Sequence, residues 1–202
     1  MRAKMSKILF ASNNTGKLRE AKAILEPYSL DIISPASLGI NLEVDETGLT
    51  YLENASLKAK VFYTAARVPC IADDSGLEVE ALHGAPGVFS HRFAGSALNT
   101  DIERCQFLLD KLRPIPKPWK ASFHCYAVFY DGKLTEYSHG ACDGEIVDEA
   151  KGTQGFGYDP IFRFEGYPLT MAEANEDLKN SISHRADALK KLLPFLKDYF
   201  SL

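Results

Sequence analysis

Short apolar runs separated by helical stripes dominate the first half of the chain. Runs at 7–11, 30–33 and 68–72 are typical of buried strands. Between them, apolar side chains recur at helical spacing, and polar start signals such as the capping box Thr50-Tyr51-Leu52-Glu53 precede the stripes. Strands that alternate with helices in this way predict an α/β protein.

The second half of the chain departs from that alternation. Residues 121–130 are rich in β-type side chains, Asp131-Gly132 is a strong hairpin signal, and 133–139 returns as the partner strand. Residues 140–147 could add another strand. We therefore expect a mixed β-sheet flanked by helices. Near the end, a Thr170-x-x-Glu173 box predicts a helix that begins at Thr170.

Length and composition fit one domain over residues 1–202, with 46% hydrophobic and 25% charged residues. The proline-rich connector around Trp119 could divide that domain into two lobes. The net charge of −4 argues against a nonspecific nucleic-acid partner, because such binding usually needs a basic excess. An acidic chain that handles phosphates must therefore gather its lysines and arginines locally.

The sequence favours a reduced, cytoplasmic protein that has no membrane partner. The four cysteines form no CxxC pair, and a chain of this length needs no disulfide to fold. The basic start, Met1–Lys7, is followed by only a very short apolar run, so we expect neither a signal segment nor a membrane span.

The most informative stretch is Ile71-Ala72-Asp73-Asp74-Ser75-Gly76, where an apolar run ends at two adjacent carboxylates. In open α/β sheets, ligands bind just beyond the carboxyl ends of strands. Neighbouring aspartates repel each other, and a hard cation such as Mg²⁺ would relieve that repulsion with oxygen ligands. The alternative is an ordinary turn, since Asp, Ser and Gly are common turn formers.

A second polar loop, Ser12-Asn13-Asn14-Thr15-Gly16-Lys17, connects the first strand to a helix. This layout presents backbone N–H groups and a helix N-terminus to a phosphate. It is not a Walker A sequence, because only one glycine precedes the lysine. A well-capped helix with a solvated lysine would explain the same residues.

Two more candidates flank the second helix. Glu46 precedes the helix start, where the helix dipole alone would favour a carboxylate, but it could also be a metal ligand that meets Asp74 in space. Lys58 and Asn54 are four residues apart and therefore share a face of that helix.

The last third of the chain carries residues that could hold a flat ring. A glycine-rich loop, 152–160, contains Phe156 and Tyr158, which could stack on a base or fold into the core. His184 and Arg185 open the last helix, where the dipole disfavours cations, so they are expected to face an anion or a base edge.

Taken together, these blocks resemble the inosine triphosphate pyrophosphatase family. The resemblance covers nearly the whole chain, because the blocks occur in order: Ser12–Lys17, Asp45–Gly48, Glu53–Lys60, Ala72–Leu77, Gly84–Gly87 with Arg92, Gly155–Phe162 and Ser181–Arg185. It implies an elongated α/β domain with a central substrate groove, and a homodimer. It also implies Mg²⁺-dependent hydrolysis of noncanonical purine nucleoside triphosphates (those of inosine, deoxyinosine and xanthosine) to the monophosphate and pyrophosphate.

The resemblance further implies a role for each matching residue. Ser12 to Lys17 would hold phosphates, together with Ser75 and Lys58. Glu46 and Asp74 would bind Mg²⁺, and Asp74, supported by Asp73, is the candidate for handling the attacking water. The base would be held and read by Phe156, Gly157, Tyr158, Asp159, Lys179, His184 and Arg185.

The residues themselves suit that chemistry. Phosphoryl transfer needs charge neutralisation and positioning more than a covalent nucleophile, and Lys17 and Lys58 would offset phosphate charge. A donor from His184 or Arg185 would pair with the 6-carbonyl of hypoxanthine and would be left unpaired by adenine. Two alternatives stay open: a Maf-type nucleotide pyrophosphatase, and a nucleotide sensor without catalysis. An RNA-binding module is disfavoured by the acidic balance.

Overall fold

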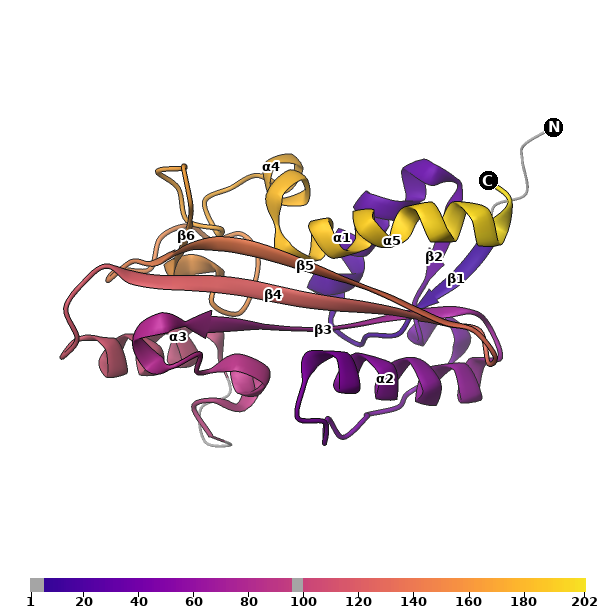
Figure 1. Cartoon of the computed structure of the whole chain (residues 1–202), viewed down its shortest axis with the longest axis horizontal. Helices are drawn as coiled ribbons and strands as arrows, with labels where there is room; N and C mark the ends of the chain where they lie inside the picture. Colours follow the sequence, from indigo (N-terminus) through magenta and orange to yellow (C-terminus); the bar gives the residue numbers. More distant parts are fainter. Residues whose placement is uncertain (1–5, 96–99) are drawn as a thin grey trace. The chain divides into compact units, whose positions relative to one another are not determined.

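A computed structural model describes residues 6–95 and 100–202, and within them six strands form one mixed sheet (Figure 1). The strand order is β2-β1-β3-β4-β5-β6. β1 pairs in parallel with β2 and β3, whereas β5 and β6 are antiparallel, which confirms the mixed sheet. The strands are β1 (Ser6–Phe10), β2 (Leu30–Ile33), β3 (Cys70–Val79), β4 (Trp119–Tyr130), β5 (Thr135–Ile146) and β6 (Phe162–Phe164).

The helices begin where the polar start signals predict them, with one exception given below. Complete capping boxes at Thr50 and Thr100 open α2 and α3. The α-helices are α1 (Thr15–Leu25), α2 (Tyr51–Ala66), α3 (Asp101–Leu112), α4 (Glu176–Ile182) and α5 (His184–Phe200). Short 3-10 turns are η1 (Glu26–Tyr28), η2 (Ala36–Leu38), η3 (Glu80–Leu82), η4 (Gly87–Arg92) and η5 (Asp159–Ile161). No helix in the described ranges is long and apolar enough to cross a membrane.

The described chain divides into two compact units, and each is considered by itself. Unit 1 comprises residues 6–74, 125–140 and 184–202, and unit 2 comprises 75–95, 100–124 and 141–183. The proline-rich connector before Trp119 lies inside unit 2. Residues 1–5, most of the basic start of the chain, lie outside the described residues.

Unit 1 has three layers, with helices on both faces of its strands (Figure 1). One core cluster joins β1, β2 and β4 to α1 and α5, and its members include Phe10, Leu25, Phe129 and Leu192. The opposite cluster joins β1 and β3 to α2 through Leu9, Ala59 and Phe62 among others. Because every strand side chain faces one layer or the other, neighbouring residues of a strand meet different helices.

Unit 2 has one core cluster. Leu77 and Val79 of β3, Leu108 and Leu112 of α3, and Phe162 at the start of β6 are among its buried members. This core holds the segments on either side of the glycine-rich loop, so the loop is anchored at both ends.

Three sequence expectations were wrong in detail. The strand that contains Asp73 and Asp74 does not stop there but continues to Val79, because Leu77 and Val79 extend the apolar pattern into the core of unit 2. Residues 135–146 form one strand rather than two. No helix begins at Thr170, although Glu173 Oε2 accepts from the Thr170 N–H at 2.8 Å, and the helix starts at Glu176 behind the Asn175 cap.

Candidate functional site: a carboxylate pair on two faces of one strand

Asp73 and Asp74 lie within β3, and both side chains are buried, with exposed fractions of 1% and 6% for the residues. Successive side chains of a strand point to opposite faces of its sheet. Asp73 accordingly contacts the layer of α1 and α5, and Asp74 contacts α2. The two carboxylates therefore make their direct ion pairs with different cations.

The Asp73 carboxylate is held by two cations. Its Oδ2 lies 3.1 Å from Lys17 Nζ of α1, and 3.1 and 3.0 Å from Nε and Nη2 of Arg185 in α5. Glu20 of α1 takes the remaining nitrogen, Nη1, of the same guanidinium. Burial alone would raise the pKa of Asp73, but Lys17, Arg185 and Lys58 outweigh it and hold the pKa well below its usual range.

The Asp74 carboxylate has a different environment. Its Oδ2 accepts from Asn54 Nδ2 at 3.1 Å, and its Oδ1 lies 3.3 Å from Lys58 Nζ. Burial raises the pKa of Asp74 despite the attraction of Lys58. Burial would lower the pKa of Lys58, but Asp74, Asp73 and Glu46 raise it above its ordinary value, so this lysine is charged.

Glu46 and Asp74 converge on one point, the Lys58 ammonium. Glu46 Oε1 lies 2.7 Å from Lys58 Nζ, and Asp74 Oδ1 approaches the same nitrogen from β3. Two carboxylate oxygens around one positive centre are hard donors of the kind that Mg²⁺ prefers. Over residues 6–95 and 100–202, no group of three or more His, Cys, Asp or Glu side chains is arranged to hold a metal ion. Glu46 and Asp74 could together supply two oxygen ligands to such a cation.

The polar loop after β1 caps α1 as its sequence predicts. Asn14 is the N-cap, and its Oδ1 accepts from the Lys17 N–H at 3.0 Å, while Ser12 Oγ accepts from the Asn14 N–H at 3.2 Å. Asn13 Nδ2 donates to the carbonyl of Leu42 at 2.8 Å. A cavity of about 490 Å³ opens beside this loop, lined by Ser12 to Thr15 and Leu18 and by residues of the segment 34–41.

The glycine-rich loop belongs to unit 2 and is organised around Asp159. Asp159 Oδ2 accepts from the Phe156 N–H at 2.9 Å and from Lys179 Nζ at 2.6 Å. Lys179 Nζ also lies 4.9 Å from the centroid of the Phe156 ring, a cation–π contact. Gly155 has φ +79°, and a Cβ there would lie 2.0 Å from Asp159 Oδ2, so the turn requires glycine.

The remaining residues predicted for the site are half-buried or buried. Tyr158 is 3% exposed and its O–H donates to the Ser90 carbonyl at 2.9 Å, so its ring packs in the core of unit 2 rather than offering a stacking face. The Gly157 N–H donates to Asp101 Oδ2 at 2.7 Å. His184 and Arg185 open α5 as expected, but both are buried, and Ser75 is half-buried.

Sequence reasoning missed two residues of these networks, Glu20 and Asp101, and it placed Asn54 on the helix face of Lys58 without giving it a role. Glu20 lies three residues after Lys17 and so shares a helix face with a lysine that was predicted. That spacing could have indicated Glu20. Asp101 sits at the start of α3, where the dipole alone explains an acid, so nothing local indicated its bond to Gly157.

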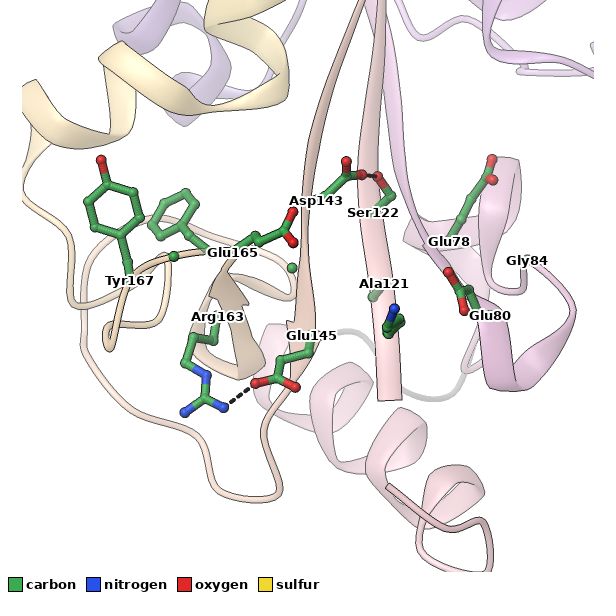
Figure 2. Close-up of a pocket in the computed structure, with 14 residues that line it drawn as sticks. Glu78, Glu80, Gly84, Ala121, Ser122, Asp143, Glu145, Arg163, Glu165 and Tyr167 are labelled. Atoms are coloured by element: carbon green, nitrogen blue, oxygen red, sulfur yellow. Dashed lines mark hydrogen bonds and ion pairs between the residues drawn. The ribbon is translucent and has the colours of Figure 1, made fainter. Parts of the chain in front are cut away.

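A separate cavity of about 770 Å³ lies in unit 2 and contains none of the predicted site residues (Figure 2). Acidic side chains from β3, η3 and β5 and from Glu165, which follows β6, line it together with Lys120 and Arg163. Several of these charges are already paired, since Asp143 accepts from Ser122, and Arg163 bonds to Glu145 (Figure 2).

Fold and site together define a class: a mixed α/β protein in which helices bring lysine and arginine side chains to two adjacent buried carboxylates of one strand. The Ham1 family model matches residues 8–195. This chain belongs to the Ham1 family.

Proteins similar to this chain are named as dITP/XTP pyrophosphatases or as HAM1 proteins. It is 44% identical over 200 residues to a dITP/XTP pyrophosphatase of Aquifex aeolicus, covering 95% of this chain and 97% of the relative. A dITP/XTP pyrophosphatase of Bacillus subtilis is 44% identical over 195 residues, with 96% and 98% covered. The solved structure of a HAM1 protein from Coxiella burnetii superimposes with a TM-score of 0.85 at 39% identity, covering 96% of this chain and all of that one.

Proposed function

We propose that this chain hydrolyses noncanonical purine nucleoside triphosphates, those of deoxyinosine, xanthosine and inosine, to the monophosphate and pyrophosphate. Such an enzyme would remove these nucleotides from the pool used for nucleic-acid synthesis. The observation that carries the proposal is the charge arrangement around β3, where Lys17 and Lys58 stand beside Asp73 and Asp74. The names of the relatives in the Ham1 family support the same activity.

In the proposed reaction, water attacks the α-phosphorus and pyrophosphate leaves. The backbone N–H groups after Ser12, together with Ser75 and Lys17, bind phosphate oxygens, and Lys58 offsets charge that develops in the transition state. Asp74 takes the proton of the attacking water. Asp73 supports this arrangement by holding Lys17 in place through their 3.1 Å ion pair.

We propose Glu46 and Asp74 as the protein ligands of Mg²⁺, because they are the carboxylates that meet around Lys58. Bound there, Mg²⁺ would stabilise the leaving oxygens and acidify water. Lys58 would then turn from the carboxylates to the phosphates of the nucleotide.

Base recognition is assigned to the residues that the resemblance implies. Phe156 offers a half-buried ring next to Lys179, and Gly157, Tyr158 and Asp159 are the other candidates of this loop. His184 and Arg185 are the cationic candidates for the 6-carbonyl of hypoxanthine or xanthine. Arg185 is already bound to Asp73 and Glu20, so reading the base requires it to share or exchange these partners.

We further propose that the protein works as a cytoplasmic homodimer. Light scattering on the purified full chain would give the oligomeric state, and a monomer would overturn that part of the proposal.

The experiment that tests the activity is product analysis with inosine, adenosine and pyrimidine triphosphates, each with and without Mg²⁺. Monophosphate plus intact pyrophosphate, formed from the inosine nucleotide and only with the metal, is the expected result. Orthophosphate and diphosphate would place the attack at the γ-phosphorus. Preference for the pyrimidine nucleotide would favour a Maf-type enzyme, and binding without turnover would favour a sensor.

Two lysines of α1 supply a matched pair of variants for this assay. Lys17→Ala is expected to lower kcat/KM by about 100-fold or more, because a charged contact to phosphate is lost. Lys22→Ala on the same helix changes only an exposed lysine, 3.8 Å from Glu26, and is expected to keep activity. Equal activity of the two variants would contradict the proposed phosphate site.

A further inference from the structure

We propose that Asn54 is a positioning residue for the reaction, which fixes the orientation of the Asp74 carboxylate and ties it to the loop that carries Glu46. This inference rests on the proposed function and assigns a role to a side chain that does not itself touch the nucleotide. Two observations support it: Asn54 is buried, and its side-chain amide makes one hydrogen bond to Asp74 and another to Gly48.

Asn54 uses both ends of its amide. Nδ2 donates to Asp74 Oδ2 at 3.1 Å, and Oδ1 accepts from the Gly48 N–H at 2.8 Å. The residue has an exposed fraction of 0%, so neither bond is replaced by water without cost. Among the common side chains, an amide of this length is the one that donates at one end and accepts at the other.

The bonds are not explained by helix capping. The N-terminus of α2 is already closed by the Thr50–Glu53 capping box, and Glu53 Oε2 also accepts from the Leu49 N–H at 2.7 Å. Asn54 lies beyond that box, and its side chain reaches across to β3. Capping of α2 therefore does not account for the hydrogen bond from Asn54 to Asp74.

The two bonds connect the proposed magnesium ligands. Gly48 is two residues after Glu46, and the amide of Asn54 joins it to Asp74. Lys58, one helical turn later, holds the other oxygen of Asp74, so both oxygens of this carboxylate are restrained from one face of α2. A Cβ at Gly48 would lie 2.7 Å from Asn54 Oδ1, so this close approach depends on glycine.

The test compares Asn54→Asp, Asn54→Ala and the control Ser138→Ala in the full chain. The aspartate keeps an acceptor for the Gly48 N–H but replaces the donor to Asp74 with a repelling oxygen. The alanine removes both bonds. Ser138 also lies in unit 1 and donates a buried hydrogen bond, at 2.7 Å, to the carbonyl of Ala188, which is not among the proposed site residues.

We expect both Asn54 variants to lose about 10- to 100-fold in kcat, since a hydrogen bond to a charged group is removed. KM for deoxyinosine triphosphate should change by less than about threefold, because the nucleotide contacts remain. Ser138→Ala should keep kcat even where its melting temperature falls. A kcat within about twofold of wild type in both Asn54 variants, measured well below their melting temperatures, would overturn the inference.

A second readout does not depend on turnover. The rise in melting temperature that Mg²⁺ produces at a fixed excess of pyrophosphate should be smaller in both Asn54 variants than in wild type and Ser138→Ala. Equal shifts in all four proteins would also contradict the inference. If wild type hydrolyses none of the nucleotides, the proposed function fails, while this shift still tests whether Asn54 orders the carboxylates. If an Asn54 variant does not fold, Asn54→Ser takes its place in both measurements.

Discussion

Asp73 and Asp74 are adjacent in β3, yet their carboxylates are neutralised by different helices. Asp73 is bound to Lys17 of α1 and Arg185 of α5, whereas Asp74 is bound to Lys58 of α2. The strand geometry alone separates them, because consecutive side chains point to opposite faces. One carboxylate is thereby fixed as a stable anion in a buried network, and the other lies where its ionised form is less favoured.

This separation predicts that a substitution at Asp73 mainly lowers stability, whereas the same substitution at Asp74 mainly lowers activity. Asp73→Asn should lower the free energy of unfolding by about 3–5 kcal/mol, because it leaves buried Lys17 and Arg185 without their common anion. Asp74→Asn should lower stability by less, because burial opposes the charge of that side chain and Glu46 remains 2.7 Å from Lys58 Nζ. It should abolish pyrophosphate release, since the proposed base is gone.

Urea unfolding at neutral pH measures the first effect, and the pyrophosphate assay measures the second. Stability that falls equally in the two variants would contradict the division of roles between the two carboxylates. So would pyrophosphatase activity in Asp74→Asn close to that of wild type.

Much of the fold and part of the site followed from the sequence. Local signals were sufficient for α2, because its capping box and apolar stripe lie within one segment, and for the start of α5. Local signals were not sufficient for β3, because Asp73 and Asp74 interrupt its apolar pattern. The two carboxylates can be buried there because side chains of α1, α2 and α5 form ion pairs with them.

The networks around the site could be predicted less well, because they join residues far apart in the chain. Arg185 is 112 positions from Asp73 and 165 from Glu20. A cation at a helix start correctly indicated a nearby anion, but the sequence could not show that this anion belongs to the protein itself. The sequence likewise left open whether Tyr158 stacks on a base or folds into the core, and its O–H donates to the Ser90 carbonyl, 68 positions away, within the core of unit 2.

Glu20 should influence base selectivity through Arg185. Glu20→Gln removes the negative partner of Nη1, while the ion pair between the guanidinium and Asp73 remains. If Arg185 reads the 6-carbonyl, the preference for inosine over adenosine triphosphate, expressed as a ratio of kcat/KM, should fall by about tenfold. Arg185→Ala should reduce the same ratio further.

The control for this measurement is Glu26→Gln, at the C-terminal end of the same helix, where the carboxylate is exposed and lies 3.8 Å from Lys22. It should keep the wild-type ratio. An unchanged ratio in both Glu20→Gln and Arg185→Ala would mean that this pair serves Asp73 only and takes no part in reading the base.

The buried thiols of the folded protein should resist alkylation. Burial raises the pKa of Cys70 to about 12 and, together with Asp101 and Asp159, that of Cys105 to about 12. Burial and the neighbouring Asp73 also raise the pKa of Cys125. Because the thiolate is the nucleophile, these three cysteines should stay unlabelled by iodoacetamide near pH 8 in native protein.

Mass spectrometry of the peptides, with urea-unfolded protein as the positive control, gives the labelling of each site. Rapid modification of Cys125 in native protein would contradict its burial next to Asp73. Modification of all three at one common slow rate would instead report global unfolding.

Stability at high pH should depend on Tyr199 of α5, whose O–H donates to Asp131 Oδ2 at 2.9 Å. Burial and this bond raise the pKa of Tyr199 from 10.0 to about 12. Between those values the folded protein binds more protons than the unfolded chain, so the free energy of unfolding must fall as the pH rises. The contribution of Tyr199 is complete below pH 10 and is lost as the pH passes the folded pKa.

Tyr199→Phe keeps the aromatic contact with Phe129, whose ring centroid lies 4.8 Å away, and removes only the titrating group. Urea unfolding from pH 9 to about pH 12 should therefore give a shallower loss of stability in the variant than in wild type. Tyr137→Phe, at a tyrosine that is 54% exposed, is the control and should follow the wild-type curve. Parallel curves for Tyr199→Phe and wild type would show that the bond to Asp131 does not persist in solution.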